Sequence, residues 1–165
     1  MRKQKGFSLI ELLIVVAIIL IIAAIAIPNL LRSRIAANEA SAVGSVRTIN
    51  TAEVTYASTY PSVGFSATMA ALGGTGTECA AGATSAHACL IDTVLAGATA
   101  STTPKSGYYF TYTQTAGTPS VQYTVLGKPA VAHQTGERTF FSDQSGVIRY
   151  DATGADATAS SSPLQ

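Results

Sequence analysis

The fold of this 165-residue chain is decided near its N-terminus by the stretch GFSLIELLIVVAIILIIAAIAIPNLL, residues 6–31. Residues 7–31 hold sixteen Leu, Ile or Val and a single charge, Glu11. A helix of these 25 residues, rising about 1.5 Å per residue, is long enough to cross the ~30 Å hydrocarbon core of a bilayer. Inserting the aliphatic side chains gains roughly 5–10 kcal/mol, more than the roughly 2.5–3.5 kcal/mol that one central carboxylate costs. The sequence therefore predicts a membrane-inserted helix over 7–31.

Three basic residues, Arg2, Lys3 and Lys5, precede the apolar run and predict its orientation. Positive flanks stay on the cytoplasmic side, so we expect the N-terminus inside the cell and the rest of the chain outside the membrane. Arg32 and Arg34 oppose this orientation, but the N-terminal cluster lies closest to the start of the run. An ordinary secretory signal peptide and a permanent uncleaved anchor are the alternatives. Against a signal peptide, the run is longer than a usual signal-peptide core and contains a carboxylate.

Composition and motifs argue against an enzyme or a nucleic-acid-binding protein. The chain has ten basic and nine acidic side chains, which is no charge excess of the kind that nucleic acids attract. Neither a glycine-rich phosphate loop nor a His-Glu-x-x-His pattern is found. His87 and His133 have no carboxylate at a telling spacing, and we assign them no catalytic or metal-binding role. We therefore expect no enzyme and no cofactor.

Residues 32–60 are predicted to continue as an amphipathic helix. Apolar positions at spacings of three, four and seven share one helical face: Ala42, Val46, Ile49, Tyr56 and Tyr60. Arg47, Asn50 and Glu53 lie largely off that stripe, and Pro61 ends the helix. Within the apolar run, Pro28 leaves a backbone carbonyl without its partner and predicts a kink or break in the helix.

The remaining sequence predicts a small antiparallel sheet and hence an α+β fold. Residues 61–106 are rich in Gly, Ala and Thr and indicate a loop region with one short helix around 89–96. Residues 107–150 hold the strand signals, which alternate aromatic and polar positions: 108–113, 121–126, 139–142 and 147–150, the last two flanking a turn at 143–146. Three or four strands are expected to pack on the amphipathic helix. Residues 151–165 are small and polar and indicate a flexible tail.

Cys79 and Cys89 are the two cysteines of the chain. Their spacing matches neither a redox pair nor a zinc pattern, and in an exported domain a structural disulfide is the favoured interpretation. Free or metal-binding thiols stay open as alternatives. Asp143, Asp151 and Asp156 are weak candidates for calcium binding, because oxygen ligands at irregular spacing suit that ion. Aspartates that merely form turns are the simpler interpretation.

The string Gly6-Phe7-Ser8-Leu9-Ile10-Glu11-Leu12, with the sequence that follows to Pro28, resembles the processing motif of type IV prepilins and type II secretion pseudopilins. The resemblance implies cleavage between Gly6 and Phe7, removal of leader residues 1–6, and N-methylation of Phe7. It also implies that Glu11 faces the N-terminal amine of a neighbouring subunit, since a paired buried carboxylate is tolerable where a lone one is not. A snorkelling or protonated Glu11 is the alternative.

Two further features bear on this resemblance. The family also carries a proline where Pro28 stands, and its helix bends or partly melts nearby on assembly. Many members have a glycine where this chain has Leu20, which weakens the expectation of melting here. The stretch 136–149 looks like the C-terminal hairpin of major pseudopilins and related pilins, although this match is weaker than the N-terminal one.

The resemblance implies a pilin-like fold, a long N-terminal helix packed on a small antiparallel sheet, and a structural role. The chain is expected to polymerise with itself into the helical homopolymer of a type IV pilus. The implied partners are a prepilin peptidase and methyltransferase, an assembly platform with its ATPase, and membrane lipid before assembly. The precursor would lie in the bacterial inner membrane, and the fibre outside it or across the periplasm. A type II secretion pseudopilin and a monomeric membrane-anchored exported binding domain are the alternatives.

Overall fold

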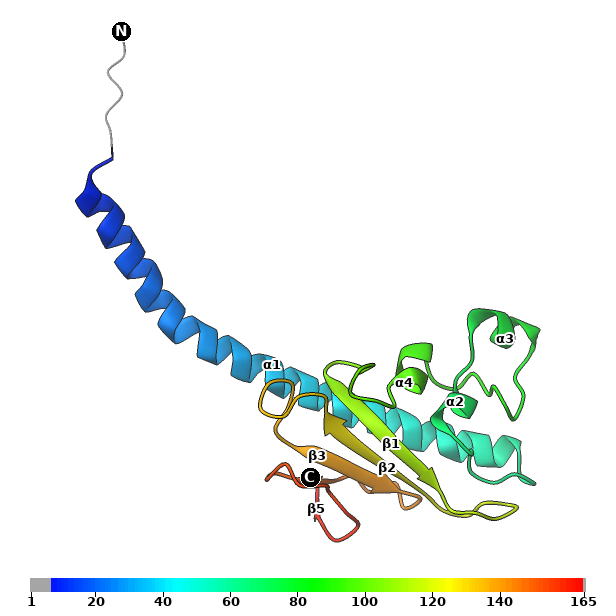
Figure 1. Cartoon of the computed structure of the whole chain (residues 1–165). Helices are drawn as coiled ribbons and strands as arrows, with labels where there is room; N and C mark the ends of the chain where they lie inside the picture. The colour runs from blue at the N-terminus through cyan, green and yellow to red at the C-terminus, as the bar shows by residue number, and fades with distance from the viewer. Residues whose placement is uncertain (1–6, 165) are drawn as a thin grey trace. The chain divides into compact units, whose positions relative to one another are not determined.

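A computed structural model gives the structure of the chain and describes residues 7–164. Gly6 and the basic leader lie outside the described residues. The chain divides into two compact units, Met1–Arg34 and Ile35–Gln165. The described elements (Figure 1) follow one another as α1 Leu9–Thr59, α2 Met69–Leu72, α3 Gly76–Ala81, α4 Thr93–Gly97, β1 Tyr108–Gln114, β2 Tyr123–Pro129, β3 Thr139–Asp143, β4 Arg149–Asp151 and β5 Ser162–Pro163.

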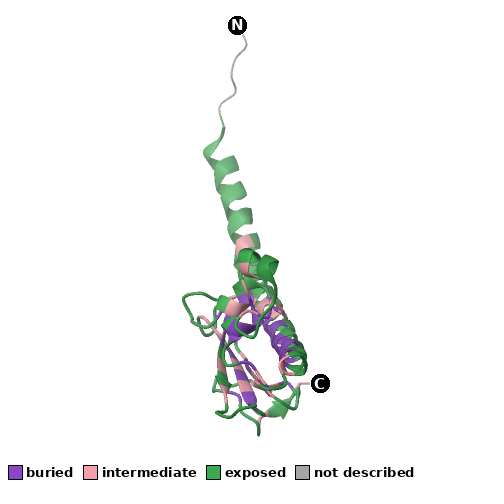
Figure 2. Cartoon of the chain, turned by 90° about the vertical axis from the view of Figure 1, so that its right-hand side faces the viewer, coloured by how far each residue is buried: buried purple, intermediate pink, exposed green. Residues whose placement is uncertain are grey.

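The first unit, as far as it is described, consists of the N-terminal part of α1. Apart from the half-buried Ala23, all its residues from Phe7 to Arg34 are exposed, as the green half of the helix in Figure 2 shows. Pro28 lies inside α1, and the helix runs through it without interruption. The predicted break in secondary structure is therefore not found, while a kink at Pro28 stays a prediction.

The part of α1 in the second unit buries one face, as the apolar stripe predicts. Ala42, Val46, Ile49 and Tyr56 are buried, and Tyr60 is half-buried just beyond the end of α1 at Thr59. Asn50 and Glu53, which lie largely off that stripe, are buried as well. Sheet and loop groups supply their hydrogen bonds, and burial of a polar side chain depends on such partners rather than on helical periodicity.

The strands of the second unit form an antiparallel meander in the order β1-β2-β3-β4-β5. The register pairs Phe110 with Gly127, Leu126 with Phe141, and Phe140 with Tyr150. The core contains buried residues of α1 and of the sheet, seen as the purple faces in Figure 2. Its largest fully buried side chains are aromatic, each of which removes about 150–250 Å² from water: Tyr56, Tyr108, Phe110, Tyr123 and Phe140. The α+β prediction is thus confirmed.

Several predicted boundaries differ from the structure. The strand expected to begin at residue 121 begins at Tyr123, and Val121 is exposed. The last hairpin strand begins at Arg149 rather than at residue 147. The helix expected around 89–96 is α4, which begins later because the side chain of Asp92 accepts a hydrogen bond from the Leu95 N–H and caps it. Two other short helices of the region, α2 and α3, were not predicted.

The C-terminal segment corrects the expectation of a free tail. Ala157 is buried, and its N–H donates to the hydroxyl of Thr139, which in turn donates to the Ala155 carbonyl. Beyond it, β5 pairs with β4, and the Leu164 N–H donates to the Ile148 carbonyl at 2.8 Å. Small polar residues predict mobility when they lack partners, but here the edge of the sheet supplies backbone partners.

Candidate self-assembly segment

The apolar segment, residues 7–31, exposes nearly all of its side chains in the described part of the chain. Its Leu, Ile and Val side chains are exposed, from 77% for Leu9 to 45% for Val16 and Leu31. Within α1 lies a stretch long and apolar enough to cross a membrane, and none of that stretch is buried. Exposed apolar surface of this extent marks a site that lipid or another protein covers.

Glu11 has a local partner within the apolar segment. The backbone N–H of Ser8 donates to Oε2 of Glu11 at 2.8 Å, and the Ser8 carbonyl accepts from the Leu12 N–H at 3.3 Å. Ser8 directly precedes the first helical residue, so the carboxylate reaches back to the helix start, as in one half of a capping box. Its negative charge also lies where the helix dipole favours an anion.

Ser8 is the residue at this site that sequence reasoning missed. The signal was available, because Ser8-Leu9-Ile10-Glu11 follows the Ser-x-x-Glu pattern of helix starts. The bond to Ser8 occupies one carboxylate oxygen, and among residues 7–164 no basic side chain forms a salt bridge with Glu11. The remaining acceptor capacity of Glu11 is open to a group from another molecule.

In the second unit, Glu53 is a fully buried carboxylate with no basic partner in the described part of the chain. It accepts hydrogen bonds from the backbone N–H of Ser66 at 3.0 Å and from the Ser66 hydroxyl. Burial raises the pKa of the Glu53 carboxyl, and the hydrogen bonds from Ser66 and Tyr112 only partly offset this. The hydrogen bonds of Glu53 thus connect α1 to the loop that leads into α2.

Glu39 makes a second set of hydrogen bonds, which connect α1 to the residues just before β3. It accepts from the backbone N–H groups of Glu137 and Arg138 at 3.0 and 3.1 Å, and from Nε of Arg138 at 2.8 Å. Although burial alone would raise it, the pKa of Glu39 is lowered by these hydrogen bonds and by the guanidinium charge. This carboxylate is satisfied within its own chain, so it needs no other partner.

The structure forms the disulfide between Cys79 and Cys89, as the sequence predicted. It gives both histidines carboxylate neighbours that sequence reasoning missed: Glu78 lies 3.4 Å from His87, and Glu137 lies 2.6 Å from His133. The second pair has a spacing of four residues, which was visible in the sequence. Both pairs are largely exposed, as surface ion pairs usually are.

The calcium candidates do not come together. Within residues 7–164 no group of three or more His, Cys, Asp or Glu side chains could hold a metal ion. Asp143 accepts from the Ser145 N–H, and Asp151 accepts from the N–H and hydroxyl of Thr153. Asp156 pairs with Lys128 at 2.7 Å. These are the contacts of turn-forming and surface aspartates.

Comparison with known proteins identifies the N-terminal segment. A family model described as the prokaryotic N-terminal methylation motif matches residues 1–27. The type IV wide pilus major component PilA4 of Thermus thermophilus is 67% identical over 39 residues, 24% of this chain and 30% of that protein. The type IV major pilin protein PilA of Myxococcus xanthus is 43% identical over 54 residues, 33% of this chain and 24% of that protein.

These similarities cover a limited part of the proteins compared. The matched stretches span less than a third of the length of either curated relative. No solved structure matches the chain. The match therefore concerns the apolar segment and its flanks.

Proposed function

We propose that this chain is a structural subunit that polymerises into a type IV pilus. Its N-terminal segment matches that of type IV pilins. The observation that carries the proposal is the exposed apolar segment, headed by the methylation motif and interrupted by one carboxylate. Lipid covers such a segment in a membrane precursor, and copies of the same segment cover it in a fibre. Contacts between copies are then heterologous, so the assembly grows without closing.

Maturation supplies the group that pairs with Glu11. Cleavage between Gly6 and Phe7 removes Arg2, Lys3 and Lys5 and creates a free amine at Phe7, which is then methylated. A methylated amine keeps its positive charge, so Glu11 of a neighbouring copy can neutralise it in apolar surroundings. The bond from Ser8 supports this role, because it orients the Glu11 carboxylate toward the start of the helix.

The proposal also implies where the precursor lies in the cell and which proteins it requires. The precursor lies in the inner membrane with its N-terminus in the cytoplasm, and the second unit lies outside, where a disulfide is stable. A prepilin peptidase and methyltransferase, an assembly platform and an assembly ATPase are required to process and extract it. The relatives named as pilus components favour a pilus over a secretion pseudopilus.

Mass spectrometry of surface fibres tests the proposal. Fibres sheared from cells that express the chain should contain it as a polypeptide beginning at methylated Phe7. Cells that lack the prepilin peptidase should retain the full precursor in the inner membrane and carry no fibres of this chain. An intact leader on a mature exported protein would contradict the proposal and favour a membrane-anchored monomer.

A further inference from the structure

Glu78 and His87 come together beside the disulfide of the second unit. Oε1 of Glu78 lies 3.4 Å from Nε2 of His87, and both side chains are accessible from solvent. Glu78 directly precedes Cys79, and His87 lies two residues before Cys89, so the bridge between the cysteines draws the two side chains together. A carboxylate and an imidazole in such proximity are a pair of potential metal ligands.

The start of α3 holds the Glu78 side chain in place. Oε2 of Glu78 accepts hydrogen bonds from the N–H and the hydroxyl of Thr75, at 2.7 and 2.8 Å. These two residues form a capping box, and Oε1, the other carboxylate oxygen, is the atom that faces His87. The hydrogen bonds from Thr75 also lower the pKa of the Glu78 carboxyl, which favours its charged form.

A tight turn fixes the backbone of His87. Its N–H donates to the Thr84 carbonyl at 3.1 Å, and its carbonyl accepts from the Thr84 N–H at 3.0 Å. The next residues are anchored as well, because the N–H of Ala88 donates to the Ala71 carbonyl at 2.8 Å. Both potential ligands thus project from backbone that is already held, which lowers the cost of ordering them around an ion.

The separation of the two side chains suits a bound metal ion better than a hydrogen bond. Bonds from zinc to imidazole nitrogen and carboxylate oxygen are about 2.0–2.1 Å long, so two ligands at a tetrahedral angle lie about 3.3–3.4 Å apart. A charge-assisted hydrogen bond would bring the two atoms to about 2.7–2.9 Å. The other histidine has such a bond, because Nδ1 of His133 lies 2.6 Å from Oε2 of Glu137. That pair is too close to hold an ion between its atoms.

A hollow beside the pair gives an ion access and room for water. It has a volume of about 270 Å³, and Glu78 and His87 belong to its lining. The rest of the lining is small and comes from α2, α3 and α4 and the residues before α3: Ala70, Gly74, Thr75, Thr93, Ala96 and Gly97. Because a water molecule occupies about 30 Å³ in the liquid, the hollow can hold the waters that complete a metal coordination shell.

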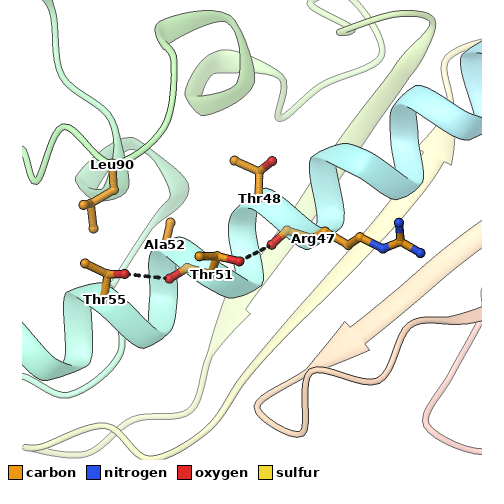
Figure 3. Close-up of a pocket in the computed structure, with 6 residues that line it drawn as sticks. All are labelled: Arg47, Thr48, Thr51, Ala52, Thr55 and Leu90. Carbon is orange, nitrogen blue, oxygen red and sulfur yellow. Dashed lines mark hydrogen bonds between the residues drawn. The ribbon is translucent and has the colours of Figure 1, made fainter.

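The groove along α1 offers no comparable ligands. Figure 3 shows it between the helix and Leu90, with a volume of about 290 Å³. None of the six residues drawn there is a His, Cys, Asp or Glu, and Arg47 supplies a positive charge that repels a metal ion. The hydroxyls of Thr51 and Thr55 donate to backbone carbonyls of the helix. Of these two hollows, the one beside Glu78 and His87 is therefore the one that suits a cation.

We propose that Glu78 and His87 bind a divalent transition-metal ion such as Zn²⁺, with water as the remaining ligands. An imidazole with a carboxylate suits zinc, copper and nickel rather than calcium or magnesium, which prefer oxygen ligands alone. Among residues 7–164 no third His, Cys, Asp or Glu joins the pair. Two protein ligands hold an ion less tightly than the three or four of catalytic and structural zinc sites, so the site exchanges its ion with the surroundings. It lies within the second unit and does not depend on fibre formation.

Calorimetric titration of the full chain in detergent with Zn²⁺ tests the site. The chain carries no polyhistidine tag, and we expect one ion to bind per molecule. His87→Ala and Glu78→Gln should each weaken the affinity at least about tenfold. Glutamine can take the place of glutamate in a capping box, so Glu78→Gln removes the charge while keeping the start of α3. His133→Ala is the matched control and should leave the affinity unchanged. Thermal unfolding followed by circular dichroism checks that all the variants fold.

X-ray absorption at the zinc edge of the loaded chain identifies the ligands directly. One imidazole nitrogen and otherwise oxygen atoms, at about 2.0–2.2 Å, are expected. A sulfur ligand or a second imidazole would place the ion elsewhere and overturn the proposal. The absence of saturable Zn²⁺ binding would overturn it as well, and so would an unchanged affinity in His87→Ala or Glu78→Gln, or an equal loss in His133→Ala.

Discussion

Glu11 and Glu53 are two carboxylates in apolar surroundings that are stabilised in different ways. Glu11 has one backbone donor, at Ser8, and lies in an exposed segment. Glu53 is enclosed by its own domain and receives two donors from Ser66. Hydrogen bonds lower the cost of burying a charge without removing it. The first carboxylate can still be neutralised by another molecule, and the second cannot.

Replacing Glu11 by glutamine separates charge from hydrogen bonding. The amide oxygen of the new side chain can still accept the bond from the Ser8 N–H, so the helix start should be kept and the precursor should reach the membrane in normal amounts. Fibre yield should fall at least about tenfold, because the attraction to a neighbouring amine is lost. Immunoblots of membrane and sheared-fibre fractions measure both quantities. Glu11→Ala should behave in the same way, and normal piliation of either variant would contradict the pairing role.

Glu53 should make the second unit less stable as pH rises. Its folded-state pKa is raised above the usual value of 4.5 by burial, so the folded state binds the proton more tightly than the unfolded state. The stability from this preference is present below pH 4.5 and is lost as pH rises through the folded-state pKa. Thermal unfolding of the full chain in detergent, followed by circular dichroism, should show Glu53→Gln gaining stability over the unaltered chain between about pH 5 and 8.

Replacing Glu53 by alanine, which leaves a cavity, should lower stability where glutamine raises it. Glu53→Ala leaves the N–H and hydroxyl of Ser66 without their acceptor and should cost about 2–4 kcal/mol below pH 4.5, with a smaller cost as pH rises through the folded-state pKa of Glu53. If Glu53→Gln showed the same pH profile as the unaltered chain, the enclosed carboxylate would not be the titrating group.

Among the elements, the disulfide-closed loop around α3 has little core of its own. None of the residues of α3 is buried, and the bridge between Cys79 and Cys89 closes a loop with a sequence separation of 10. Its removal by Cys79→Ser and Cys89→Ser together should lower the free energy of unfolding by about 2–3 kcal/mol, chiefly by releasing loop entropy in the unfolded state. Chemical denaturation of the two forms compares them, and equal midpoints would contradict the expectation.

The C-terminal segment should also contribute to stability. Truncation after Gly154 removes the bonds of Ala155, Ala157 and Leu164 and uncovers the edge of β4, which should cost about 2–4 kcal/mol. Thermal unfolding of the truncated and complete chains measures the loss. A chain ending at Gly154 with an unchanged melting temperature would restore the original expectation of a free tail.

Local sequence patterns predicted the elements in which residue spacing alone indicates a buried face. The stripe of Ala42, Val46 and Ile49 and the alternation in β1 were sufficient, because periodicity reports directly on a buried face. The burial of Glu53 could not be predicted, because its partner Ser66 comes from a loop whose position depends on the whole fold. The order of residues 155–164 depends likewise on a sheet edge formed elsewhere in the sequence.

For the whole molecule, charges at the two ends of the apolar segment should determine its orientation. Neutralising Arg2, Lys3 and Lys5 leaves Arg32 and Arg34 as the nearest basic flank and should invert part of the population. The oxidation state of Cys79 and Cys89 reports the orientation, because the cytoplasm keeps thiols reduced. Neutralising Arg32 and Arg34 as well should restore the disulfide in most chains. Full oxidation in the first variant would show that these charges do not set the topology.

The strand pairing at the C-terminal end has a practical consequence for imaging the proposed filaments on living cells. Because β5 pairs with β4 as the last strand of the sheet and Leu164 is half-buried, a fluorescent protein fused directly after the last residue should weaken that pairing. Residues 99–104 form a loop that is exposed throughout and are the better place for a small dye-binding peptide. Labels there should leave filament number and length as they are in unlabelled cells.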